Sequence, residues 1–188
     1  MRSLRFILAA VLAAGSVTAS AADAGIRDFF WPDHQSGLKY KVRSHGLNGQ
    51  FSMTLGETVE IGGKQYRAVQ TTGQGYRVKR ETIYLRADEQ AIYARYAASP
   101  DAPEVIELKL PIEEGSHWST VDRDGNPSER EITGIGPCKT REGLEFERCV
   151  RVDYRWQELA AVSFFSPKSG EVIFSGANGF FNRRLSRP

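Results

Sequence analysis

The residue types that most often carry out chemistry are few in this chain. Its three histidines, His34, His45 and His117, form neither a His-x-His nor a His-Glu-x-x-His pattern. A zinc hydrolase site therefore lacks its usual pair of ligands on one element. No Gly-x-Ser-x-Gly elbow is present to expose a nucleophilic serine. We expect no metal site, no cofactor and no motif-borne catalytic residue. If the chain is a hydrolase, His34, His117 and Asp33 are the first residues to test.

Two weaker matches have simpler explanations. Ser36-Gly-Leu-Lys39 fits the Ser-x-x-Lys pattern of penicillin-binding enzymes, but it lacks a Lys-Thr-Gly partner and precedes a strand. The segment from Asp122 begins like a calcium loop, yet Pro127 stands where that loop needs glycine. Asp124-Gly125-Asn126 is typical of a hairpin turn.

The amino-terminal segment predicts export. Arg2 and Arg5 precede an apolar run from Phe6 to Ala14, and Ala19-Ser20-Ala21 offers small residues for cleavage. This is the pattern of a secretory signal peptide covering residues 1–21. The run is shorter than the roughly 20 residues needed to span a bilayer. We therefore expect a periplasmic or secreted protein, with residues 22–188 forming one domain without a transmembrane segment.

The charge of the mature chain argues against nucleic acid as a partner. The full sequence has 25 Lys plus Arg and 23 Asp plus Glu, and removal of Arg2 and Arg5 leaves 23 of each sign. Nucleic-acid binding needs a concentrated positive field. The only local basic excess is residues 180–187, which we interpret as a terminal strand ending in a solvated tail.

Export to an oxidising compartment bears on the state of the two cysteines, Cys138 and Cys149. In an oxidising compartment a single pair favours a disulfide over a metal site or a catalytic thiol. A tight turn near Gly143 and Leu144 can set the two cysteines directly opposite each other on neighbouring antiparallel strands, within disulfide reach.

Short alternating runs dominate the mature chain and predict a mainly all-β fold. Leu38, Tyr40 and Val42 alternate with basic residues, and Ile106 and Leu108 flank Glu107, which the pattern assigns to the solvated face. Residues 89–98 tolerate a helix, although their tyrosines favour a strand. Residues 22–28 fit either a short helix or a frayed end. Frequent Gly, Pro and Asp-Gly turns suit successive antiparallel hairpins.

Several short motifs carry a resemblance to a family. These are Phe29-Phe-Trp-Pro32, Gly37 to Val42, Ile61 to Tyr66, Leu108 to Trp118, the Cys138–Cys149 hairpin, and Phe165 to Val172. Over residues 29–174 the chain resembles a broad set of uncharacterised secreted bacterial β-rich proteins, a domain of unknown function. The resemblance implies a strongly curved antiparallel sheet, rolled into a half-barrel or open barrel, and brings no catalytic residue. Ser166-Pro-Lys-Ser departs from the hydrophobic Pro-Gly-Val turn more frequent in that set.

Two classes of function stay open. Aromatic residues recur in nearly every predicted strand, and a curved sheet rich in them forms either a filled core or an apolar cleft. We expect a non-enzymatic binding, carrier or interaction module for an apolar ligand, a lipid or an envelope protein. Trp31, Tyr40, Trp118 and Trp156 are the candidate contact residues. The alternative is a periplasmic hydrolase whose active site no motif reveals. The sequence does not indicate the oligomeric state.

Overall fold

A computed structural model describes residues 25–74, 81–157, 159–176 and 181–186, so the expected signal peptide lies outside the described residues. The described chain is almost entirely β, as predicted. The strands are β1 (Gly37–Ser44), β2 (Leu47–Ile61), β3 (Lys64–Gln74), β4 (Glu81–Ala87), β5 (Ala91–Arg95), β6 (Val105–Lys109), β7 (His117–Val121), β8 (Pro127–Lys139), β9 (Glu145–Trp156), β10 (Leu159–Ser166), β11 (Gly170–Gly176) and β12 (Phe181–Leu185).

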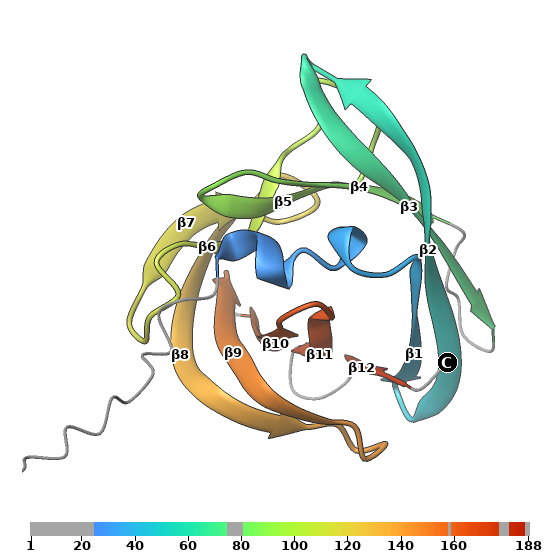
Figure 1. The fold of residues 1–188 in the computed structure, drawn as a ribbon, viewed down its shortest axis with the longest axis vertical. Helices are drawn as coiled ribbons and strands as arrows, with labels where there is room; N and C mark the ends of the chain where they lie inside the picture. The colour runs from blue at the N-terminus through green and yellow to red at the C-terminus, as the bar shows by residue number, and fades with distance from the viewer. Residues whose placement is uncertain (1–24, 75–80, 158, 177–180, 187–188) are drawn as a thin grey trace, which may run out of the picture.

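The strands form one antiparallel sheet that curls into an open barrel. Their order is β6-β5-β4-β3-β2-β1-β12-β11-β10-β9-β8-β7, so β6 and β7 are the two edges. Where these edges meet, side chains replace the backbone ladder. Trp118 Nε1 donates to the Ile106 carbonyl at 3.2 Å, and the Ile106 amide donates to Thr120 Oγ1 at 2.8 Å. The open-barrel prediction is therefore confirmed, with one seam between β6 and β7 (Figure 1).

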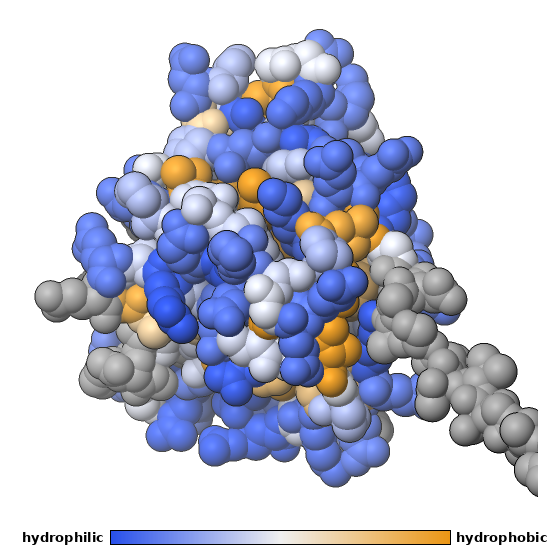
Figure 2. All heavy atoms as spheres, turned by 90° about the vertical axis from the view of Figure 1, so that its left-hand side faces the viewer, coloured by the Kyte–Doolittle hydropathy of each residue, from blue (hydrophilic) through white to orange (hydrophobic). Residues whose placement is uncertain are grey.

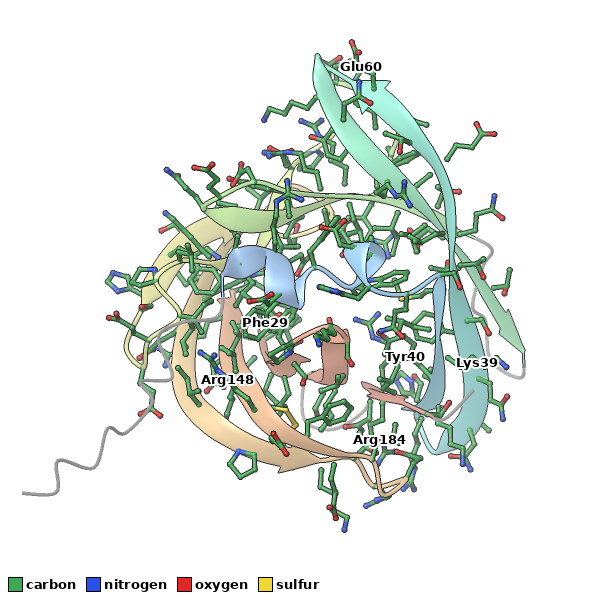
Figure 3. The ribbon with its side chains drawn as sticks, in the orientation of Figure 1. Phe29, Lys39, Tyr40, Glu60, Arg148 and Arg184 are labelled. Carbon is green, nitrogen blue, oxygen red and sulfur yellow. A yellow bond between two sulfur atoms is a disulfide. The ribbon has the colours of Figure 1, made fainter. Side chains whose placement is uncertain are left out.

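Strand β1 follows the alternation read from its sequence. Leu38, Tyr40 and Val42 are buried, whereas the basic residues between them are exposed. Figure 3 shows Tyr40 pointing to the inside of the ring of strands and Lys39 pointing away from it. Residues 91–95 form β5, which settles the ambiguous alanine-rich stretch in favour of a strand. The outer side of β6–β8 is mostly hydrophilic (Figure 2).

Two short 3-10 helices, η2 (Ile26–Phe29) and η3 (Trp31–Asp33), lie within the ring of strands (Figure 1). Phe29 and Trp31 are at most 5% exposed and belong to the hydrophobic core. The β10–β11 turn packs on this segment: the Lys168 amide donates to the Asp28 carbonyl. A Cβ on Gly170, where φ is +64°, would lie 2.7 Å from Trp31 Cδ1. Only glycine fits there, and the helices fill that part of the interior.

The solvated position predicted for Glu107 is wrong. Glu107 is the extra residue of a β-bulge, because Ile92 pairs with Leu108 while Tyr93 pairs with Ile106. A bulge breaks the inward-outward alternation and redirects a side chain, and Glu107 faces the barrel interior. The terminal strand predicted in the basic segment is β12, which lies inside the sheet between β1 and β11. Its Arg183 pairs in register with inward-facing Val42 and also lines the interior.

Candidate ligand-binding site

A cavity of about 420 Å³ occupies the barrel interior. That volume lies within the range of small-molecule sites. Much of its wall is apolar or aromatic, and these residues come from strands on all sides of the barrel: Val42, Phe51, Ile83, Val105, Trp156 and Phe174. The cavity thus offers apolar surface to a ligand within the barrel.

A second cavity, of about 80 Å³, lies beside the 3-10 helices and is lined by their aromatic residues Phe29, Phe30 and Trp31. Ile83 and Tyr96 line both cavities, as do three charged residues: Glu107, Glu171 and Arg183. The shared residues therefore lie between the two spaces. Together with Arg130, which lines the larger cavity, the three charged residues form what we call the interior charge band: Glu107, Arg130, Glu171 and Arg183.

The first ion pair of the band joins neighbouring strands β11 and β12. Arg183 Nε donates to Glu171 Oε1 at 3.0 Å, and Nη2 donates to the same oxygen. The guanidinium lies 5.4 to 5.6 Å from the ring centres of Phe174, Phe51 and Tyr40. Cations within about 6 Å of aromatic rings are attracted to the ring faces. Arg183 is held from several directions, so its charge is fixed inside the barrel.

The second pair crosses the seam. Arg130 of β8 donates through Nη1 to Glu107 Oε2 at 2.8 Å and to the Glu107 carbonyl at 3.0 Å. Its guanidinium carbon lies 4.3 Å from the ring centre of Tyr154. Arg130 is 7% exposed, and its Nε is buried with no hydrogen-bond partner among the described residues. This donor is unused by the protein, and the nitrogen itself is covered by the atoms around it.

Burial dominates the electrostatics of this region. It raises the pKa of Glu171, and nearby Arg183 offsets that effect only in part. Burial also raises the pKa of Tyr96, helped by the negative charge of Glu107, towards which the Tyr96 hydroxyl points at 3.4 Å. Tyr96 therefore stays a neutral phenol that can donate and accept hydrogen bonds. The arrangement can hold a polar group against an otherwise aromatic wall.

The four aromatic residues predicted from the sequence lie in different places. Trp156 is half-buried and lines the larger cavity. Trp31 and Tyr40 come together on the smaller cavity, where the Tyr40 hydroxyl donates to the Glu171 carbonyl at 2.8 Å. Trp118 is buried at the seam and lines neither cavity. Sequence reasoning missed the interior charge band, because a charged residue in an alternating strand normally faces water.

Among the described residues, no hydrogen bond or ion pair joins the residues named for a hydrolase, Asp33, His34 and His117, to one another. A ring nitrogen of His34 lies 3.3 Å from the Arg27 carbonyl oxygen, and Asp33 pairs with Arg27. His117 is exposed at the start of β7. Within the described ranges, no hydrogen bond joins either histidine to a carboxylate or a hydroxyl. No group of three or more metal-ligating residue types is found among the described residues either.

Cys138 and Cys149 form the predicted disulfide, with Cα atoms 5.8 Å apart. They are not directly opposite, however, and that expectation is wrong. An irregularity in β8 pairs Gly136 with Cys149 and Cys138 with Phe146, so the bond crosses the ladder diagonally. The disulfide agrees with the predicted periplasmic or secreted location, since such bonds persist in oxidising compartments. No helix within the described part of the chain is long and apolar enough to cross a membrane.

Comparisons with known proteins identify the fold but not a family. No family model matches the sequence, and no curated protein matches it. A crystal structure from Bacteroides fragilis NCTC 9343, of a protein inferred to be exported and described as having a YMCC-like fold, aligns with a TM-score of 0.53 and 13% identity. The alignment covers 80% of this chain and 93% of that one.

A protein inferred to be a lipoprotein, from Parabacteroides distasonis ATCC 8503, aligns with a TM-score of 0.48 and 13% identity. That alignment covers 79% of this chain and 92% of the other. At 13% identity, the likeness to the Bacteroides fragilis protein is one of fold alone. The chain shares its fold with this protein inferred to be exported, which is consistent with the expected resemblance to uncharacterised exported β-rich proteins.

Proposed function

We propose that this protein binds a small amphipathic molecule inside its barrel and serves as an exported binding or carrier protein. The observation that carries the proposal is the coexistence of apolar walls and paired charges around one cavity of about 420 Å³. A purely structural interior would be expected to close around its side chains, because protein cores pack to the density of organic crystals.

The polar lining supports a ligand with two chemical parts. Buried ion pairs are weak evidence for stability, since desolvation offsets much of the attraction between the charges. Here two such pairs, Glu171–Arg183 and Glu107–Arg130, border the same space. A role in recognition gives a reason for placing them in the barrel, while Phe51, Ile83 and Trp156 would contact the apolar part. The ligand expected from sequence was apolar; the charge band refines it to an amphiphile.

The test is a titration with N-phenyl-1-naphthylamine, an uncharged fluorophore that brightens in apolar surroundings. Two matched variants on β3 separate the cavity from the surface: Thr71 lines the cavity and is buried, whereas its neighbour Thr72 is exposed. Thr71→Phe places a ring in the cavity, and Thr72→Phe places the same ring on the outside. We expect saturable binding to the wild type, a loss of about tenfold or more in affinity for Thr71→Phe, and no change for Thr72→Phe.

Circular dichroism and the thermal midpoint would establish that both variants are folded. Val42→Phe, at a second cavity-lining position, covers the case in which Thr71→Phe does not fold. The proposal would be contradicted by dye binding that does not saturate. It would also be contradicted if folded Thr71→Phe and Thr72→Phe bound the dye with equal affinity.

A further inference from the structure

The interior charge band also restricts the kind of head group that the cavity accepts. We propose that the ligand is a neutral amphiphile, whose uncharged head bears hydrogen-bond donors and acceptors and contacts the two ion pairs. This rests on the proposed function and narrows it to one chemical class.

Charge balance is the first step. The band holds two guanidinium groups, Arg130 and Arg183, and two carboxylates, Glu107 and Glu171, each joined to a partner of opposite sign. Its formal charge is zero. A free carboxylate or ammonium entering this space would add an uncompensated charge to a largely desolvated interior, where isolated charges are costly. A head without net charge avoids that cost.

Unused hydrogen-bonding capacity is the second step. Glu171 accepts both bonds from Arg183 on Oε1, and no bond to its Oε2 is found among the described residues. Arg183 donates through Nε and Nη2 only, in that same part of the chain, which leaves the donors of its Nη1. The band therefore offers acceptors and donors side by side. Hydroxyl groups both donate and accept, so a hydroxylated head can serve both.

The surrounding wall is the third step. Phe51 and Phe174 line the larger cavity, and the Arg183 guanidinium lies within 5.5 Å of the ring centre of each. Trp156 and Ile83 extend the apolar surface. An apolar chain can lie along these residues while its head stays at the band. Outside the band, the lining also holds the Arg123–Glu81 pair, which is balanced, and Asp122, which accepts bonds from within its own turn and adds one negative charge.

The experiment uses three probes with related eight-carbon chains: 1-monooctanoylglycerol, octanoate and octylammonium. Calorimetric titration at pH 7.5, below the micelle concentration of each, gives their affinities directly. We expect the neutral glyceride to bind the wild type about tenfold or more tightly than either ion. Octanoate or octylammonium binding as tightly as the glyceride would overturn the proposal, as would an absence of binding by all three.

Because the probes differ in intrinsic hydrophobicity, a charge variant supplies the internal control. Glu171→Gln gives the band one excess positive charge, and Glu107→Gln does the same at the other pair if the first variant fails to fold. We expect octanoate to gain about tenfold in affinity relative to the glyceride. An unchanged ratio would overturn the head-group proposal. The dye titration decides separately whether the cavity binds anything, so the two proposals can fail independently.

Discussion

Two groups of charged residues, one outside the barrel and one inside, contain the same residue types but differ in how completely their hydrogen bonds are satisfied. The outer group is centred on Glu104, which accepts bonds from Arg86 at 2.7 and 3.0 Å, from Lys64 at 3.1 Å and from the Tyr66 hydroxyl. Arg95 donates to the Tyr66 oxygen and to three carbonyls of the β5–β6 loop. Each oxygen of Glu104 has two partners. The outer cluster is saturated, whereas the inner band is not.

The difference appears in the ionisation of the two carboxyl groups. Burial opposes the charged form of Glu104, but hydrogen bonds from Arg86, Tyr66 and Lys64 prevail and lower its pKa to about 2. For Glu171 burial prevails over Arg183, and the pKa is raised. A carboxylate with many donors stabilises the fold, while a partly buried one with few donors contributes little. The outer cluster therefore fixes the β5–β6 loop, whereas the contacts of the inner band agree with the recognition role proposed for it.

The largest expected effect is at the outer cluster. Glu104→Gln removes the charge that faces Arg86, Lys64 and Arg95, and leaves Asp88 as the remaining acid of the partly buried Arg86. Removing one partner of such a group typically costs several kcal/mol, so we expect a loss of about 3 kcal/mol in the free energy of unfolding. Urea denaturation at pH 7 measures it. Glu145→Gln, in an exposed pair with Lys139, is the control and should change nothing measurable. Equal effects would contradict the comparison.

Lowering the pH should change the contributions of Glu104 and Glu171 to the free energy of unfolding in opposite directions. The folded-state pKa of Glu104 is depressed, so its contribution is present above the ordinary value of 4.5 and is lost as pH falls towards about 2. That of Glu171 is raised, so the folded state takes up its proton first, and stability rises as pH falls through the raised value towards 4.5. Free energies of unfolding against pH for the wild type, Glu104→Gln and Glu171→Gln give the two difference curves. If the two difference curves had the same slope against pH, the proposed contrast between Glu104 and Glu171 would be wrong.

The smallest expected effect is at the inner band when both partners change. Glu171→Gln combined with Arg183→Met leaves neither charge uncompensated, and such exchanges are often neutral or stabilising. We expect the free energy of unfolding to stay within about 1 kcal/mol of the wild type, while affinity for 1-monooctanoylglycerol falls. Denaturation and calorimetry on the same preparation measure both. A large loss of stability with unchanged affinity would make the inner band structural.

The sequence predicted the architecture better than the site, for a physical reason. Strand periodicity reports which face is buried, and in β1 the alternation of Leu38, Tyr40 and Val42 was correct. At Glu107 the bulge opposite Ile92 and Tyr93 reverses the assignment, and no local signal marks it. Arg183 is inward because β12 pairs with β1, about 140 residues away in sequence, which only closure of the sheet determines. Residue spacing therefore cannot predict a site whose side chains are oriented by a β-bulge and by pairing between distant strands.

The central claim is that the barrel interior is a ligand site. The most direct test is mass spectrometry of small molecules extracted from protein exported in its native cell, comparing the wild type with Thr71→Phe and Thr72→Phe. We predict a neutral amphiphile in roughly stoichiometric amount with the wild type and Thr72→Phe, and its loss from Thr71→Phe. No extractable molecule in any of the three, together with no dye binding to the purified wild type, would contradict the claim.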